Sequence, residues 1–142
     1  MLLLSTLAML PFRVLLIEDA CIFQYGLSWQ LAAWGFQHVV VASTGKEAVR
    51  AATQQRPDLI IVSASLKGSP GGLETVRLIQ QQYRTPIPIL LLQDHRPGVE
   101  PERLPPLLLN YRCLPKPPTI EELQVGVEQS IRALSLSAVE VG

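Results

Sequence analysis

The sequence predicts an α/β fold in which helices cover both faces of a parallel sheet. Short apolar runs rich in branched residues alternate with segments whose apolar positions repeat at helical spacing. The 142 residues and the hydrophobic fraction of 48% suit one domain with a substantial core. Polar residues follow several of the apolar runs, and ligands of such sheets bind at the carboxyl ends of the strands. These observations set the fold class before any motif is considered.

The first half of the chain alternates three expected strands with three expected helices. Strands are predicted at residues 12–17, 38–42 and 59–62, and helices at residues 22–34, 44–55 and 72–83. Gly35 is placed to end the first helix, and Ser43 or Thr44 to cap the second. Each helix therefore connects two strands, as a parallel sheet requires.

The second half of the chain is less regular. Strands are predicted at residues 87–92 and 111–114, and Thr119 is predicted to cap a final helix that ends near Leu134. Nine of the 12 prolines lie between Pro86 and Pro118, so any helix between these strands is expected to be short and to begin near Pro105 or Pro106. Residues 135–142 are expected to form an unstructured tail.

Charge, cysteine content and the N-terminal segment narrow the class of protein. Lys and Arg together number 12, as do Asp and Glu, so no basic surface for nucleic acid is expected. The two cysteines, Cys21 and Cys113, form no CxxC, which favours a reducing, cytoplasmic setting. Residues 1–11 are apolar but lack a basic region and a cleavage site. They are predicted to form an extension rather than an export signal, and no stretch is predicted to span a membrane.

Candidate site residues follow the predicted strands. Glu18 and Asp19 follow the first strand, Ser63 the third, and Lys116 the fifth, while Gln93 and Asp94 follow the fourth. Adjacent carboxylates at a strand end provide hard oxygen ligands for an ion such as Mg²⁺. Because the carboxyl ends of parallel strands meet at one edge of a sheet, these side chains are predicted to lie together.

The ordered set of RVLLIEDA (13–20), PDLII with LKGSPGGLE (57–74) and Lys116-Pro117 resembles the receiver domain of bacterial two-component response regulators. The resemblance covers residues 12 to about 134, which sets a receiver-like domain between the extension at 1–11 and the tail at 135–142. It implies a flavodoxin-like (CheY-like) doubly wound sheet of five strands in the order 2-1-3-4-5, with five helices, of which the fourth is weak here.

The resemblance also implies roles for single residues. Glu18 and Asp19 take the positions that hold Mg²⁺, Lys116 takes the position of the family's lysine, and Pro117 that of a proline that is often cis. Ser63, however, stands where the family has the aspartate that a histidine kinase phosphorylates. Other departures from the family pattern are Gln93 at the Thr/Ser switch position, Cys113 at the aromatic switch position and Asp94 beside the phosphate.

These departures predict a pseudo-receiver, which is not an enzyme and does not switch by aspartyl phosphorylation. A serine hydroxyl is a poor nucleophile without a base, and a Ser63–His95–carboxylate set is the alternative in which it would react. Losing one carboxylate predicts that Mg²⁺ is weakly held, if at all, and that no cofactor is required. Lys116 is expected to turn to Asp19 or Asp94. Asp58, at the start of its strand, is expected at the far end of the sheet.

Three functions remain open from the sequence. The first is a protein-interaction module in phosphorelay signalling, whose partner is a histidine kinase, a regulator or an output protein. Its expected partner surface includes Leu107, Leu108 and Leu109, and the face of the fourth helix, fifth strand and fifth helix is a candidate homodimer interface. The second function is a working phospho-receiver with an atypical acceptor. The third is a binder of a small molecule or flavin, disfavoured because the loop EDACIFQYG lacks a phosphate cradle.

Overall fold

The computed structural model describes residues 12–94 and 111–141, which form one five-stranded sheet and four helices. The strands are β1 (Arg13–Ile17), β2 (His38–Ala42), β3 (Leu59–Ser63), β4 (Ile89–Gln93) and β5 (Tyr111–Pro115). The helices are α2 (Cys21–Ala33), α3 (Gly45–Gln54), α4 (Gly72–Gln80) and α5 (Ile120–Val141). The predicted fourth helix near Pro105, the extension at residues 1–11, and the residues His95 and Leu107 to Leu109 lie outside the described residues.

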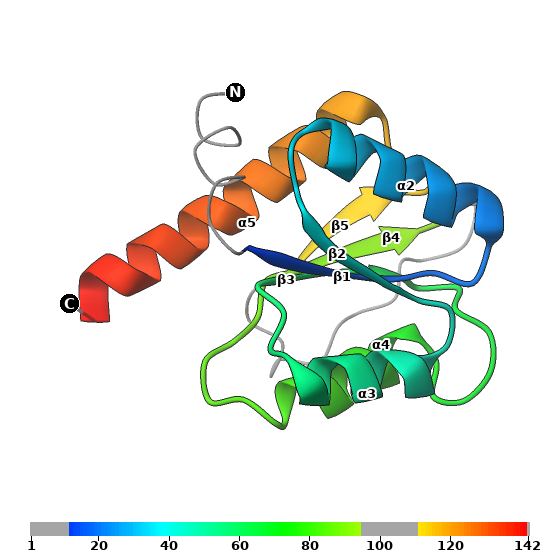
Figure 1. The fold of residues 1–142 in the computed structure, drawn as a ribbon, viewed down its shortest axis with the longest axis horizontal. Helices are drawn as coiled ribbons and strands as arrows, with labels where there is room; N and C mark the ends of the chain where they lie inside the picture. Colours follow the sequence, from blue (N-terminus) through cyan, green and yellow to red (C-terminus); the bar gives the residue numbers. More distant parts are fainter. Residues whose placement is uncertain (1–11, 95–110, 142) are drawn as a thin grey trace.

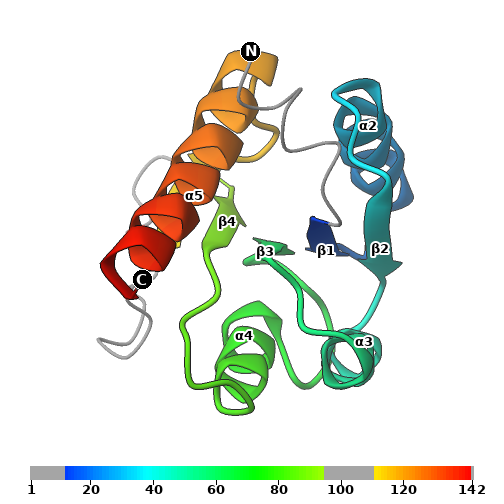
Figure 2. The ribbon, with the colours of Figure 1, turned by 60° about the vertical axis from the view of Figure 1, so that its left-hand side comes forward.

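All strands of the sheet are parallel, and their order is β2-β1-β3-β4-β5. This confirms the predicted doubly wound, CheY-like sheet. Helices α2 and α5 cover one face, and α3 and α4 cover the other (Figure 1; Figure 2). Because every crossover returns to the same edge, the carboxyl ends of β1, β3, β4 and β5 line up there.

Alternation along the strands divides the apolar core into two layers. On β1, Val14 and Leu16 face α2 and α5, whereas Leu15 and Ile17 face α3 and α4. Every residue of β3 is buried. A strand buried on both faces reads as a continuous apolar run, which is why the position of β3 could be predicted.

Reciprocal capping bonds fix the starts of two helices. The Thr44 hydroxyl accepts from the Glu47 amide, and the Glu47 carboxylate accepts from the Ser43 amide. At α5, Thr119 and Glu122 exchange the same pair of bonds, at 2.9 and 3.0 Å. Each arrangement satisfies two amides that the first helical turn leaves unpaired.

Several predicted boundaries were wrong, and helix α4 ends at Gln80 rather than at residue 83. Strand β4 begins at Ile89 rather than at residue 87, because the Gln80 amide group bonds both the backbone N–H and the carbonyl of Ile87, at 3.1 and 2.8 Å. The predicted unstructured tail is helical, since α5 continues to Val141. The sequence ALSLSAVEV contains no glycine or proline that would stop the helix before Gly142. None of the helices in the described part of the chain is long and apolar enough to cross a membrane.

Candidate functional site

The carboxyl edge of the sheet brings together Lys116, Glu18 and Ser63, which come from the ends of β5, β1 and β3. The Lys116 Nζ lies 2.8 Å from Glu18 Oε1 and 3.1 Å from Glu18 Oε2, and the second contact is a hydrogen bond. The same ammonium donates to the Ser63 Oγ at 2.8 Å. Glu18 and Ser63 are fully buried, and the Lys116 side chain is 5% exposed. The site is therefore a buried ion pair with a neutral hydroxyl beside it.

The neighbours of Lys116 complete its surroundings. Ser65 Oγ lies 3.3 Å from the Lys116 Nζ and 3.0 Å from the Ser63 Oγ. On the other side, the Lys116 Nζ lies 4.7 Å from the centre of the Phe23 ring, a cation–π contact. The ammonium thus has a carboxylate, two hydroxyls and an aromatic face around it. A buried lysine with these contacts is satisfied without any added ligand.

Asp19 and Glu18 turn in different directions. The Asp19 Oδ2 accepts a hydrogen bond from the Lys67 amide at 2.8 Å, so Asp19 holds the loop that follows β3. Lys116 pairs with Glu18, and the prediction that it would turn to Asp19 or Asp94 was wrong. Consecutive side chains of an extended segment point to opposite sides, which separates the two carboxylates.

Both carboxylates of the acid pair already have partners within the protein. Residues 12–94 and 111–141 contain no group of three His, Cys, Asp or Glu side chains that could hold a metal ion. One carboxylate, on Glu18, is already neutralised by Lys116, and Asp19 has one oxygen bound to the Lys67 amide. The remaining nearby oxygens include the hydroxyls of Ser63 and Ser65, which are weak ligands for a hard cation.

The other predicted site residues lie on or next to β3, β4 and β5. Gln93 is the last residue of β4, and its Nε2 is buried without a hydrogen-bond partner among the described residues. Cys113, in the middle of β5, is exposed, and desolvation of the thiol raises its pKa. The Lys116–Pro117 peptide bond is cis. Asp58 lies at the opposite end of β3, as predicted, and it accepts a hydrogen bond from the Arg13 amide at 2.8 Å.

Sequence reasoning missed three residues around the site: Phe23, Gln24 and Ser65. The Gln24 Nε2 donates to the Glu18 carbonyl and, at 2.9 Å, to the Ser43 Oγ, so it ties the ends of β1 and β2 together. Neither Phe23 nor Gln24 follows a strand, and both reach the site from the first turns of α2. Ser65 lies two residues after β3, so its position after a strand could have pointed to it. Phe23 and Gln24 have no such signal in the sequence.

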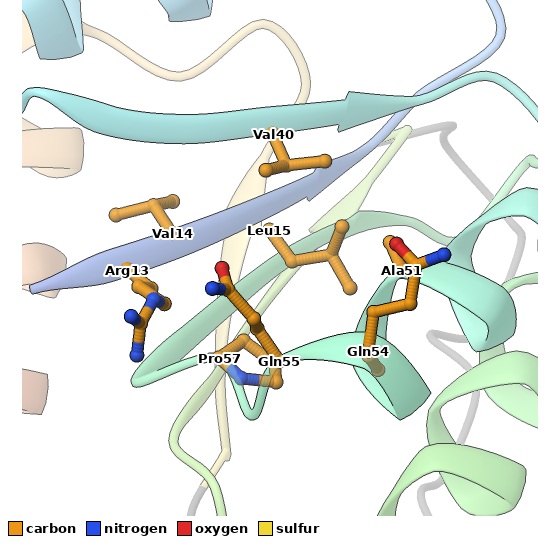
Figure 3. A pocket seen from close by; sticks show the side chains of 9 residues that line it. Arg13, Val14, Leu15, Val40, Ala51, Gln54, Gln55 and Pro57 are labelled. Carbon is orange, nitrogen blue, oxygen red and sulfur yellow. The ribbon is translucent and has the colours of Figure 1, made fainter.

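A separate cavity of about 300 Å³ opens at the amino edge of the sheet, away from Lys116 (Figure 3). Its lining includes Arg13 and Val40 from the strands and Gln54 and Gln55 from the end of α3. No carboxylate, thiol or hydroxyl lines it. The cavity therefore offers no nucleophile.

Comparison with known proteins finds a family whose members match most of this chain. The model of the response regulator receiver domain matches residues 14–127. The transcriptional regulatory protein PdtaR of Mycobacterium tuberculosis is 29% identical over 134 residues, which make up 94% of this chain and 63% of PdtaR. The chain thus spans less than two thirds of that relative.

Solved structures show the same fold. The N-terminal domain of a response regulator/sensory box/GGDEF protein from Carboxydothermus hydrogenoformans superposes with a TM-score of 0.77 at 26% identity, over 89% of this chain and 98% of that one. The chemotaxis protein CheY4 of Vibrio cholerae gives a TM-score of 0.69 at 24% identity, over 84% of this chain and 98% of that one. With a family model that matches most of its residues and the strand order of that fold, the chain belongs to the response regulator receiver domain family.

Proposed function

We propose that this chain is a pseudo-receiver, which signals through protein–protein contact and does not switch by aspartyl phosphorylation. One observation carries the proposal: Ser63, at the acceptor position, is fully buried and bonded at 2.8 Å to a lysine that is already paired with Glu18. The Lys116 ammonium already has the Glu18 carboxylate as its counter-charge, so this pocket needs no phosphoryl group to pair with the lysine.

The chemistry of Ser63 supports this reading. A serine becomes nucleophilic only when a base takes its proton. The Lys116 Nζ donates to the Ser63 Oγ at 2.8 Å and is paired with the Glu18 carboxylate at 2.8 Å, so in this arrangement it is a hydrogen-bond donor to Ser63 rather than a base. Ser63 therefore acts as a hydrogen-bond partner that holds Lys116 in place.

The switch positions support it as well. In the family, a hydroxyl after the fourth strand contacts the phosphate, and Gln93 has no hydroxyl to do so. Cys113 has no ring that could change rotamer on activation. Coupling between a modified Ser63 and the β5 side of the molecule would need both positions. The absence of both the hydroxyl and the aromatic ring favours an output that does not depend on modification of Ser63.

The side of the molecule formed by β5 and α5 is the proposed surface for a protein partner such as a histidine kinase, a regulator or an output protein. Tyr111, Ile120 and Val125 are exposed apolar side chains there, and exposed charges on Arg112 and Glu121 lie among them. Apolar anchors within a charged rim are typical of non-obligate interfaces. Leu107 to Leu109 and a homodimer through this face remain predictions. PdtaR is named a transcriptional regulator, so a protein that controls transcription is one class of output.

Incubation with acetyl phosphate and Mg²⁺, followed by intact-mass measurement, tests the proposal. The wild-type protein is expected to gain no phosphoryl group, whereas Ser63→Asp is expected to gain one, which hydroxylamine then removes. A wild-type adduct that hydroxylamine removes would identify an acyl phosphate elsewhere and refute the pseudo-receiver. An adduct that resists hydroxylamine and is lost in Ser63→Ala would instead support the working receiver with an atypical acceptor.

A further inference from the structure

We propose that two copies of this chain associate through the outer face of α2. This face, called here the α2 face, consists of Ile22, Tyr25, Gly26 and Trp29. Ile22 is 78% exposed, Tyr25 is 77% exposed and Trp29 is 70% exposed. Large apolar side chains this exposed on one helix are unusual for a surface that meets only water.

The spacing of these residues places them in one stripe. Ile22, Tyr25 and Trp29 stand at positions i, i+3 and i+7 of the helix, whereas Leu27 and Leu31 on its inner side are buried. The inner side packs on the sheet, and the outer side is turned away from both the sheet and α5 (Figure 2). A stripe with this repeat is the pattern through which one helix packs against another.

The absence of charge favours a second copy over a charged partner. The sequence from Ala20 to Gly45, which includes α2 and the edge strand β2, contains no Asp, Glu, Lys or Arg. On the β5–α5 side, by contrast, Arg112 and Glu121 are exposed among the apolar side chains. A neutral apolar stripe is complementary to itself, and a two-fold axis pairs the same patch from both copies.

The area of the α2 face is sufficient for a pair. Aromatic side chains cover about 150–250 Å² each when buried, so Tyr25 and Trp29 with Ile22 offer roughly 500 Å² per copy. A symmetrical pair would bury about 1,000 Å² in total, which is where specific interfaces begin. We therefore expect a weak, reversible dimer whose population rises with protein concentration.

Gly26 allows the two helices to come close. It lies in the middle of the stripe, and a Cβ built on it would meet nothing within 4 Å in the monomer. A glycine inside a helix weakens the helix, so the residue has no advantage for the isolated fold. In a helix pair, the missing side chain leaves room for the aromatic residues of the second copy.

Sedimentation velocity over a concentration series tests the proposal. The wild-type protein is expected to move from its monomer mass of 15.7 kDa toward twice that mass as concentration rises. Tyr25→Glu with Trp29→Glu is expected to stay at 15.7 kDa, and the matched control Gln54→Glu with Gln81→Glu, at exposed positions of α3 and directly after α4, to dimerise as the wild type does. A wild-type protein that is monomeric at about 1 mM, or a dimer that Val125→Glu on α5 dissolves and the α2 variant does not, would overturn the proposal.

A second measurement keeps the test independent of how the double variant folds. In a Trp34→Phe background, Trp29 is the remaining tryptophan and reports on the α2 face. Its emission is expected to shift to the blue, and its quenching by acrylamide to fall, over the same concentration range as dimerisation. Unchanged emission in the dimer would refute the α2 face as its interface. Binding of the monomer to neutral lipid vesicles without self-association would identify a membrane as the occupant instead.

Discussion

The Nζ of Lys116 lies 2.8 Å from the Oγ of Ser63, so the lysine that follows β5 is bonded to the last residue of β3. A serine cannot neutralise an ammonium, and that task falls to Glu18, which is fully buried beside it. The counter-charge of Lys116 thus comes from the end of β1 and not from β3. The consequences can be measured as stability, ion binding and modification.

Removing the ammonium should strongly destabilise the fold. Lys116→Met leaves the Glu18 carboxylate buried and unpaired, which costs about 3–5 kcal/mol of unfolding free energy. The double variant Glu18→Gln/Lys116→Met should recover at least half of that loss, because both charges are gone. Urea denaturation followed by circular dichroism measures these differences.

A matched control for that experiment is Lys67→Met. Lys67 is an exposed residue, and its contact with Asp19 is made by the backbone amide, so the change should cost less than about 0.5 kcal/mol. Equal losses for Lys116→Met and Lys67→Met would show that the buried ion pair does not contribute to the fold as described.

Placing a carboxylate at the end of β3 should create a stronger metal site. Ser63→Asp adds a third acid beside Glu18 and Asp19, and Mg²⁺ is expected to bind at least about tenfold more tightly than to the wild-type protein. Isothermal titration calorimetry gives both constants. Ser63→Asn has the same shape without the charge and should bind Mg²⁺ as weakly as the wild type. If the two variants bind equally, charge is not what the pocket lacks.

The sheet was predicted well because a strand that is buried on both faces appears in the sequence as a continuous apolar run. Strand β2 has the predicted bounds, and β3 differs from its prediction only by the final Ser63. The start of β4 was missed because the Gln80 side chain, seven residues earlier, occupies the backbone groups of Ile87, and hydrophobic periodicity does not reveal such a contact. Helix ends depend on such contacts in the same way, so they are the weakest part of a prediction from sequence.

The membership of the site was predictable, but its pairing was not. Parallel strands place Glu18, Ser63 and Lys116 at one edge. In the structure, Glu18 and Ser63 each lie within hydrogen-bond distance of the Lys116 Nζ. Which acid meets Lys116 depends on the direction in which each carboxylate leaves the backbone. Asp19 follows Glu18 immediately and points to the Lys67 amide, so a choice based on charge alone picked the wrong acid.

Two glycine-to-alanine changes should have opposite effects. A Cβ on Gly72 would lie 2.3 Å from the carbonyl oxygen of Ser63, so Gly72→Ala must displace α4 or the end of β3, at a cost on the order of 1–3 kcal/mol. A Cβ on Gly26 meets nothing within 4 Å, and Gly26→Ala should stabilise α2 by about 1 kcal/mol. Thermal unfolding at low protein concentration measures both without self-association. Destabilisation by Gly26→Ala under these conditions would contradict the open surroundings of that residue.

The pair of Glu74 and Arg77 on α4 should make a small, pH-dependent contribution to stability. The hydrogen bonds from Arg77, at 2.7 and 3.0 Å, lower the pKa of Glu74 below its ordinary value of 4.5. Because the pKa of Glu74 is lower in the folded state, the contribution to stability is fully present above the ordinary value of 4.5. It is lost as the pH falls through the folded-state pKa. Glu74→Gln should therefore lower the melting temperature slightly at about pH 7 and leave it unchanged at about pH 2.

Arg77→Gln provides the check on that pair, because it removes the same interaction from the other side. Both side chains are 47% exposed, so the effect should be small and should shrink further in high salt. The double variant should melt no lower than the less stable single variant, since the interaction can be lost only once. Additive losses in the double variant, or a loss that grows as the pH falls, would mean that the two residues stabilise α4 through separate contacts.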